Sequence, residues 1–313
     1  MSGPEIMTAA SERSVPPPTL IGVLRQWSRQ RWIPFGVRDR LLRLFADPDR
    51  MPSVPFECDY ASLRYQGDLS GYIDWMVYFY GVYEPGVLAF LRDVATVAGS
   101  GAVFVDVGAN VGTHTLGLAR RVSRLHAFEP WPTAFSALRR NVEINALDNV
   151  VLHPYGLGDA NAQLTFHVPI TANRGTGGFV PNVNANRPGE TLPVRRGDEV
   201  FADVVERVDL VKIDTEGYEL KALAGMRASL ASFRPVVVVE VSPATLTERV
   251  GKLSPSIALT ESLGEGWQIF RLSGAERYRL EPFRYAEGEI ATAVLVPEDK
   301  LIRLPRAGCW SDV

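Results

Sequence analysis

From residue 102 onward, short apolar runs alternate with amphipathic stretches, and this alternation restricts the possible folds more than any other feature of the sequence. The stretches at 111–122 and 133–147 have the apolar spacing of helices. Strands that are apolar on both faces belong to parallel sheets covered by helices, so the pattern predicts an α/β fold. Only a loop separates the last two runs, which predicts an antiparallel edge. The runs expected to form strands are 102–108, 125–130, 149–156, 208–214, 235–241, 267–272 and 290–296.

The segment VFVDVGANVG (103–112) is the most informative part of this pattern. A strand ends near Asp106, and Gly108 and Gly112 let the chain turn into a helix, so a ligand is expected at this carboxyl end of the sheet. A dinucleotide-binding turn has glycine where this chain has Asp106, because pyrophosphate needs bare backbone. A carboxylate there suits a ligand with cationic groups, such as S-adenosylmethionine. Glu129, at the end of the next strand, is placed to accept the two ribose hydroxyls.

Composition removes several classes of function. The net charge of -3 gives no general attraction to nucleic acid, so we expect no nucleic-acid partner. Two cysteines and four histidines make a disulfide framework or a zinc site unexpected, and we predict a cytoplasmic protein. The sequence has no apolar run long enough to cross a bilayer. It says nothing about the oligomeric state.

We predict four parts along the chain: a disordered tail over 1–19, a helical lead-in over 20–98, a cofactor-binding domain over 99–300 and a C-terminal tail over 301–313. The lead-in is expected to begin with helix broken at Pro34 and to end with a helix at 85–97.

The start of the lead-in is basic, with seven arginines against three aspartates between Leu20 and Arg50. This segment predicts a lid, a patch for an acidic or membrane-bound substrate that would give peripheral membrane contact, or simply a solvated helical surface.

The sequence resembles the FkbM family of methyltransferases over about residues 70–300. The resemblance rests on GYIDWMVYFYGVYEP, VFVDVGANVGTHTLGLA, HAFEP, HPYGLGD, VDLVKIDTEGYELKALAGM and PVVVVEV. It implies a class I methyltransferase (Rossmann-like) fold, with a seven-stranded, mostly parallel sheet whose last strand is antiparallel and with helices on both faces. It also implies S-adenosylmethionine as the methyl donor and usually a hydroxyl as the acceptor.

Matched motif by motif, the resemblance implies that the glycine-rich turn holds the methionine end of the cofactor, that Glu129 holds the ribose and that Gly158 and Asp159 lie near the adenine. Asp214 and Glu216 would face the transferring methyl group. The full set expected to bind the cofactor is Glu84, Asp106, Gly108, Asn110, Gly112, Thr113, Glu129, Pro130, Gly158, Asp159 and Asp214.

Four residues are candidates for catalysis: Asp214, Glu216, His153 and Glu240. All four lie at the predicted ends of strands, where an open α/β sheet places its ligands. Asp214 or Glu216 could act as the base that takes the acceptor's proton, could bind a divalent ion, or, for Glu216, could stabilise the start of the next helix. These carboxylates make a bound Mg²⁺ possible, but nothing else in the sequence supports one, and we assign no metal ligands.

The expected activity is O-methylation of a hydroxyl on a sugar, a glycan or a natural product. Methylation of a carboxyl group or a nitrogen of a small molecule is the alternative. An NAD-dependent oxidoreductase is a more distant rival, because Asp106 would repel its pyrophosphate. A nucleic-acid methyltransferase should have a proline-aromatic tetrapeptide where this chain has IDTEG. A scaffold that has lost its chemistry is disfavoured by the intact acids Asp106, Glu129 and Asp214.

Overall fold

The computed structural model describes residues 17–171, 173–182, 184–242, 255–274, 277–286 and 288–309. Most of the predicted N-terminal tail and the last four residues lie outside these ranges. The main sheet is built from β3 (Val103–Val107), β4 (Arg124–Phe128), β5 (Val150–His153), β9 (Leu210–Ile213), β10 (Val236–Val241), β11 (Trp267–Ser273), β12 (Arg277–Pro282), β13 (Ala291–Pro297) and β14 (Ala307–Cys309).

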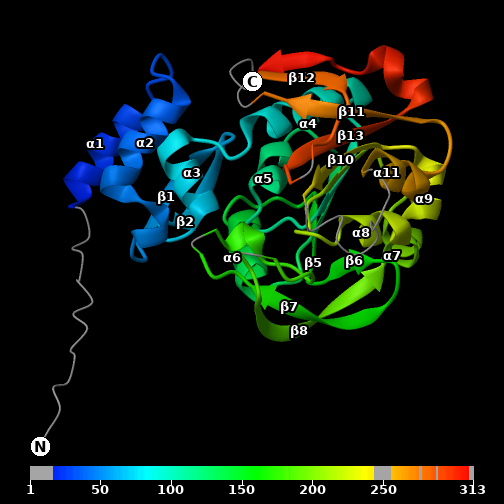
Figure 1. The fold of residues 1–313 in the computed structure, drawn as a ribbon, viewed down its shortest axis with the longest axis horizontal. Helices are drawn as coiled ribbons and strands as arrows, with labels where there is room; N and C mark the ends of the chain where they lie inside the picture. The colour runs from blue at the N-terminus through cyan, green and yellow to red at the C-terminus, as the bar shows by residue number, and fades with distance from the viewer. Residues whose placement is uncertain are drawn as a thin grey trace, which may run out of the picture.

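These strands lie in the order β14-β12-β11-β13-β10-β9-β3-β4-β5 (Figure 1). The five strands from β10 to β5 are parallel, and β13 runs antiparallel to both β10 and β11. The class I methyltransferase fold is therefore confirmed, with each of the seven expected strands present and the last one, β13, antiparallel. Two further strands, β12 and β14, extend the sheet to nine. The sequence does not predict them because β12 is mostly polar and exposed and β14 has only three residues.

Helices cover both faces of the main sheet, because successive strand residues point to opposite sides. One core contains Phe104 together with Leu88 and Leu116. The other contains Val105 together with Phe201 and Leu223. The first face is covered by α4 (Pro85–Ala98), α5 (Thr113–Ala119) and α6 (Pro132–Glu143), and the second by α7 (Gly197–Val204), α8 (Glu219–Gly225), α9 (Arg227–Phe233) and α11 (Pro255–Leu263).

A small second sheet lies beside the carboxyl ends of the parallel strands (Figure 1). It consists of β6 (Gly156–Gly158), β7 (Ala162–Val168) and β8 (Arg187–Arg196), in the order β6-β8-β7. The antiparallel pairing of β7 with β8 matches the hairpin-like section that the sequence indicates between residues 163 and 196. The connection between them carries a single 3-10 turn, η2 (Arg174–Thr176).

The N-terminal part forms a lobe to one side of the main sheet (Figure 1). As expected, its first helical region is interrupted at Pro34, giving α1 (Pro18–Ser28) and α2 (Phe35–Ala46), followed by η1 (Pro48–Arg50). The expectation of a purely helical lead-in is wrong. A hairpin of β1 (Pro55–Tyr60) and β2 (Leu63–Asp68) precedes α3 (Tyr72–Tyr80), because Leu63 and Tyr65 alternate with exposed polar residues and are buried on one face.

The aromatic cluster of α3 holds this lobe together. Trp75 is fully buried, and its Nε1 donates a hydrogen bond of 2.7 Å to the carbonyl of Ala46 in α2. Trp75 and Phe79 pack with Leu42 in one core shared by α1, α2 and α3.

The C-terminal segment is also structured: after η3 (Glu298–Arg303), β14 pairs with β12, so part of the expected tail belongs to the main sheet. The division into domains stays a prediction.

The outer surface of α1 and α2 is unusually apolar. Leu44 is 71% exposed and Phe45 is 57% exposed, on the same two helices that carry most of the arginines of the basic segment. None of the helices in the described residues is both long and apolar enough to span a bilayer. The exposed large apolar side chains of this region are Val23, Trp32, Phe35, Val37, Leu41, Leu44 and Phe45.

Candidate functional site

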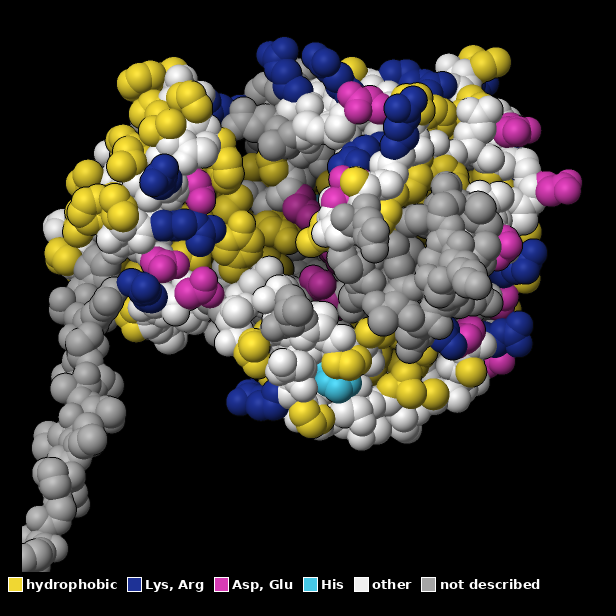
Figure 2. Space-filling model, viewed as in Figure 1, with side chains coloured by type: hydrophobic (Ala, Val, Ile, Leu, Met, Phe, Trp, Pro, Cys, Tyr) yellow, Lys and Arg dark blue, Asp and Glu magenta, His cyan; other side chains and the backbone are white. Residues whose placement is uncertain are grey.

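A pocket lies at the carboxyl ends of β3, β4, β9 and β10, and its empty volume, which includes open space at its mouth, is about 840 Å³. Figure 2 shows a hollow between the N-terminal lobe and the main sheet, with acidic side chains deep inside it. This is the edge at which an open parallel sheet is expected to bind its ligand. Eight residues predicted from the sequence line this pocket together: Gly108, Asn110, Thr113, Glu129, Pro130, Asp214, Glu216 and Glu240.

The glycine-rich turn forms one wall of this pocket. Gly108 has a φ of 81°, and a Cβ atom there would lie 1.8 Å from the backbone oxygen of Asp214, so only glycine fits between the ends of β3 and β9. Asn110 follows in the left-handed region with a φ of 51°. The turn therefore exposes bare backbone to the pocket.

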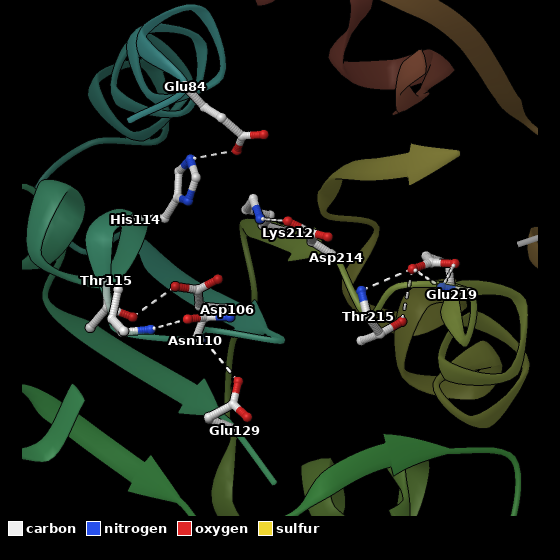
Figure 3. A network of polar contacts seen from close by, with 12 residues as sticks. Glu84, Asp106, Asn110, His114, Thr115, Glu129, Lys212, Asp214, Thr215 and Glu219 are labelled. Carbon is white, nitrogen blue, oxygen red and sulfur yellow. Dashed lines mark hydrogen bonds and ion pairs between the residues drawn. The ribbon is translucent and has the colours of Figure 1, made fainter. Parts of the chain in front are cut away.

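Glu129 is buried at the end of β4 and ties this turn to the next segment. Its Oε2 accepts a hydrogen bond of 2.8 Å from the amide of Asn110, and its Oε1 accepts one of 2.8 Å from the amide of Trp131 (Figure 3). Burial raises the pKa of Glu129 to about 7, although the two amide donors favour the charged form. A carboxylate held by two fixed amides has a fixed orientation and still has lone pairs for hydroxyl donors of a ligand.

Lys212 is a buried cation among acids. From its place on a strand it was expected to be structural or to face the substrate, not to be catalytic. Parallel register places Lys212 on β9 directly beside Asp106 on β3. Its Nζ donates a hydrogen bond of 2.8 Å to Oδ2 of Asp214. Asp106 Oδ2 accepts a hydrogen bond of 2.7 Å from Thr115, whereas its buried Oδ1 has no hydrogen-bond partner among the described residues (Figure 3). Asp106 thus lies beside the pocket, next to a residue that lines it.

Three carboxylates lie close together at the carboxyl ends of β9 and β10. One oxygen from each of Asp214, Glu216 and Glu240 lies within 4.8 Å of the others. The charge of Asp214, together with burial, raises the pKa of Glu240 well above its ordinary value, and burial followed by Asp214 raises that of Glu216. Oxygen ligands at this spacing suit a divalent cation such as Mg²⁺. The cluster alone does not assign a metal to the site.

The helix-stabilising role that the sequence allowed for Glu216 belongs to Glu219. Glu216 and Gly217 both have positive φ values, 54° and 110°, so the chain turns before α8 begins. Oε1 of Glu219 accepts hydrogen bonds of 2.9 Å from the amide of Thr215 and 3.0 Å from that of Gly217. Glu216 is consequently free to face the pocket that it lines.

Glu84 lies on the other side of the site, at the start of α4, with a φ of 46°. Its Oε2 is 3.4 Å from Nε2 of His114, without the alignment of a hydrogen bond (Figure 3). His114 lines the pocket, and burial lowers its pKa well below the ordinary value, so its ring is neutral. Burial also raises the pKa of Glu84, although Lys212 opposes this effect.

Six of the predicted site residues do not line the pocket: Asp106 and Glu84 lie beside it, and the other four lie farther away. Gly112 and Gly158 are needed for packing: a Cβ at Gly112 would meet Leu138 at 2.5 Å, and one at Gly158 would meet Val194 at 2.8 Å. Asp159 is on the surface, where it forms an ion pair of 3.1 Å with Lys221. His153, the fourth, is buried elsewhere in the sheet.

The second sheet and its connection supply pocket residues that the sequence analysis did not assign. Gly177 and Gly178 in this connection line the pocket, as expected for a polar loop over this edge of the sheet. Aromatic side chains join them because the short β6-β8-β7 sheet folds back over the ends of β4 and β9. The spacing of these residues along the chain does not predict that the second sheet packs over the pocket. The aromatic residues are Trp131, Phe166, Phe179 and Tyr218.

His153 packs as part of a buried ring stack. Its ring lies 4.2 Å from that of Phe128, centroid to centroid, and its nitrogens lie 3.1 Å from His126 Nδ1 and 3.1 Å from the hydroxyl of Tyr155. Burial lowers the pKa values of His126 and His153 to about 4. Because the folded state favours neutral rings, stability is fully present above pH 6.5 and is lost as the pH falls toward 4.

We therefore expect His153→Gln to lose less stability than the wild type on acidification from pH 6.5 to 4, by on the order of 2 kcal/mol. Urea unfolding across this range measures the difference. Tyr155→Phe is the matched control, because it removes the hydrogen bond between Tyr155 and His153 without removing a group that titrates in this pH range. Parallel pH profiles for the wild type and His153→Gln would contradict this account.

Comparison with known proteins agrees with the geometry. A family model described as Methyltransferase FkbM domain matches residues 106–271. Methyltransferase 1 of Beauveria bassiana is 32% identical over 180 residues, which cover 51% of this chain and 70% of that protein. Hexuronic acid methyltransferase AglP of Haloferax volcanii is 32% identical over 164 residues, which cover 51% of this chain and 65% of AglP.

Among solved structures, the methyltransferase FkbM of Methylobacillus flagellatus KT is 20% identical, with a TM-score of 0.42, over 70% of this chain and 49% of that one. The family model spans more than half of the sequence and includes the glycine-rich turn, Glu129, Asp214 and Glu240. The chain belongs to the FkbM family of methyltransferases.

Proposed function

We propose that this chain binds S-adenosylmethionine in the pocket and transfers its methyl group to a hydroxyl of a sugar, a glycan or a natural product. The observation that carries the proposal is the charge of the pocket. Acidic side chains line it at the ends of β4, β9 and β10, and Lys212 is the only lysine or arginine among the described residues that line it. Family membership also decides against the NAD-dependent oxidoreductase.

The residues present fit such a cofactor. Its sulfonium and ammonium groups are cations, and the buried Oδ1 of Asp106, which has no hydrogen-bond partner in the described chain, is an acceptor suited to a cationic ligand. A phosphate-bearing cofactor would be repelled by the same acids. The backbone at Gly108 is open to close approach by a ligand because no side chain can stand there. The fit is thus in charge and in the close approach that Gly108 permits.

Each part of the cofactor has a matching group in the pocket. Glu129 would accept the hydrogen bonds of the ribose hydroxyls, since its orientation is fixed by two amides. Trp131 and Leu157 line the pocket and would offer apolar surface to the adenine. The glycine-rich turn and Asp106 would hold the methionine end.

Bound S-adenosylmethionine supplies an electrophilic methyl group on a positively charged sulfur. Transfer breaks the bond from carbon to sulfur and forms one from carbon to the acceptor oxygen, while the hydroxyl proton must leave. Burial and the charge of Asp214 raise the pKa values of Glu216 and Glu240, which favours their protonated forms over the charged forms that could take this proton. Asp214, which is paired with Lys212, is the carboxylate that we propose accepts it. The walls of the pocket orient the acceptor and exclude water.

The relatives support a sugar acceptor. The name of AglP says that it methylates a hexuronic acid, and we extend this class of acceptor to the present chain as a proposal. Methylation of a carboxyl group or of a nitrogen is the alternative.

We expect Asp214→Asn to lower kcat by about 10²–10⁴-fold, because the variant lacks the base, while the Kd for S-adenosylmethionine changes by less than about tenfold. Transfer of a radiolabelled methyl group to a panel of uronic-acid and neutral oligosaccharides measures the first quantity, and calorimetry the second. Asp159→Asn is the control, since Asp159 lies on the surface. An unchanged kcat in Asp214→Asn would remove Asp214 from this role.

We also propose that the exposed apolar surface of α1 and α2 contacts an anionic bilayer. Apolar side chains interspersed with arginines are typical of helices that lie in a membrane surface. Leu44 and Phe45 are the most exposed pair of neighbours on α2, and the segment from Leu20 to Arg50 has a net charge of +4.

Sedimentation with vesicles tests this contact. We expect binding to vesicles that contain phosphatidylglycerol, weaker binding to pure phosphatidylcholine, and loss of at least about tenfold in affinity for the double variant Leu44→Glu, Phe45→Glu. Ile302→Glu is the control, because Ile302 is 98% exposed but lies far along the chain. Equal binding by the double variant and the wild type would refute the proposal.

A further inference from the structure

A second cavity lies where the N-terminal lobe meets the main sheet. Its volume is about 620 Å³, within the roughly 300–1,000 Å³ of most small-molecule sites. Its walls come from the end of α1, from α2 and α3, from the start of α4 and from β11 and β13. The hollow in Figure 2 lies between the same two parts of the molecule. The space is sufficient for an oligosaccharide.

This cavity adjoins the proposed cofactor pocket. Tyr83 lines both. Glu84 lines the second cavity, and its carboxylate lies 3.4 Å from His114, which lines the first. The loop that contains Tyr83 and Glu84 is therefore the partition between the two spaces, and a ligand in the second cavity has a short path to the first.

The two cavities carry opposite charge. Among the residues that the structure describes, the first is lined by four acids and one lysine, whereas the second is lined by three arginines, Arg29, Arg31 and Arg38, and one acid, Glu84. Arg38 is buried and structural, since it donates hydrogen bonds to the carbonyls of Ile33 and Ser28. Arg29 and Arg31 are the guanidinium groups that remain for a ligand.

Neither of these two arginines has a carboxylate within ion-pair distance among the described residues. Nη2 of Arg29 donates a hydrogen bond of 3.0 Å to the carbonyl of Tyr78. The same nitrogen would lie 3.6 Å from a Cβ at Gly81, two residues before the partition. Burial and the neighbouring Arg25 lower the pKa of Arg29, although Asp59 opposes this effect in part.

Aromatic rings provide the rest of the surface. Phe35 and Tyr80 line the second cavity with centroids 5.0 Å apart, and Tyr72 lies in the same wall. Flat aromatic faces are the surfaces against which sugar rings pack. Guanidinium forks bind carboxylate and phosphate groups through paired hydrogen bonds.

We propose that the second cavity is the acceptor site and that Arg29 and Arg31 bind an anionic group of the acceptor. This inference rests on the proposed function and narrows it to acidic glycans, in which a carboxylate or a phosphate is the recognised group. The division of charge supports the assignment. The acids of the first cavity repel an anionic acceptor and favour a cationic cofactor, and the arginines of the second do the reverse.

The test is a titration of the whole chain, saturated with S-adenosylhomocysteine, with three probes: a disaccharide ending in glucuronic acid, its neutral counterpart ending in glucose, and glucose 6-phosphate. We expect the wild type to bind the glucuronic-acid or the phosphate probe at least about tenfold more tightly than the neutral sugar. Which of the two binds identifies the anion. Arg31→Gln should remove most of this preference, a loss of about 10–100-fold for the anionic probe.

Arg40→Gln is the matched control, because Arg40 is an exposed arginine of α2 that does not line the cavity. Arg29→Gln provides a second variant, with its fold checked by circular dichroism. Equal binding of all three probes, binding of none, or an anion preference that survives both Arg29→Gln and Arg31→Gln would overturn the proposal. Failure of S-adenosylhomocysteine to bind would instead overturn the proposed function, so the two failures are distinguishable.

Discussion

The ion pair of Lys212 with Asp214 is the interaction on which the rest of the site depends. A lysine that is 5% exposed is costly to bury, and it is stabilised because acids surround it. The same cation makes it possible for Asp106 and Asp214 to lie side by side at the sheet edge. Register fixes the arrangement, since Lys212 lies opposite Asp106 on the neighbouring strand. A closely packed parallel sheet thereby produces a local concentration of negative charge.

The main sheet and the N-terminal lobe contribute side chains of opposite charge to the two cavities. The main sheet presents its acids toward one pocket, and the N-terminal lobe presents arginines and aromatic rings toward the other. The loop at Tyr83 and Glu84 separates the two spaces. In the binding mode that we propose, opposite charges on the two sides give the donor and the acceptor different places to bind.

Much of this could be predicted from the sequence. The seven expected strands and the acids Glu129, Asp214 and Glu240 follow from apolar runs and from the ends of strands. What could not be predicted depends on contacts between distant segments. Gly158 fits the motif but packs against Val194. The basic segment was expected to offer a patch for an acidic substrate, but its sequence does not show that Arg29 lines a cavity beside Tyr83. The β1–β2 hairpin was missed because its polar residues hide the alternation of buried ones.

The central claim is that the pocket binds S-adenosylmethionine through the acids that end its strands. Calorimetric titration of the wild type, Glu129→Gln and the exposed control Glu143→Gln tests it most directly. We expect micromolar binding of S-adenosylmethionine and S-adenosylhomocysteine, roughly 10–100-fold weaker binding to Glu129→Gln alone, and no binding of NAD. Binding of NAD, or an affinity for S-adenosylmethionine that does not change in Glu129→Gln, would contradict the account.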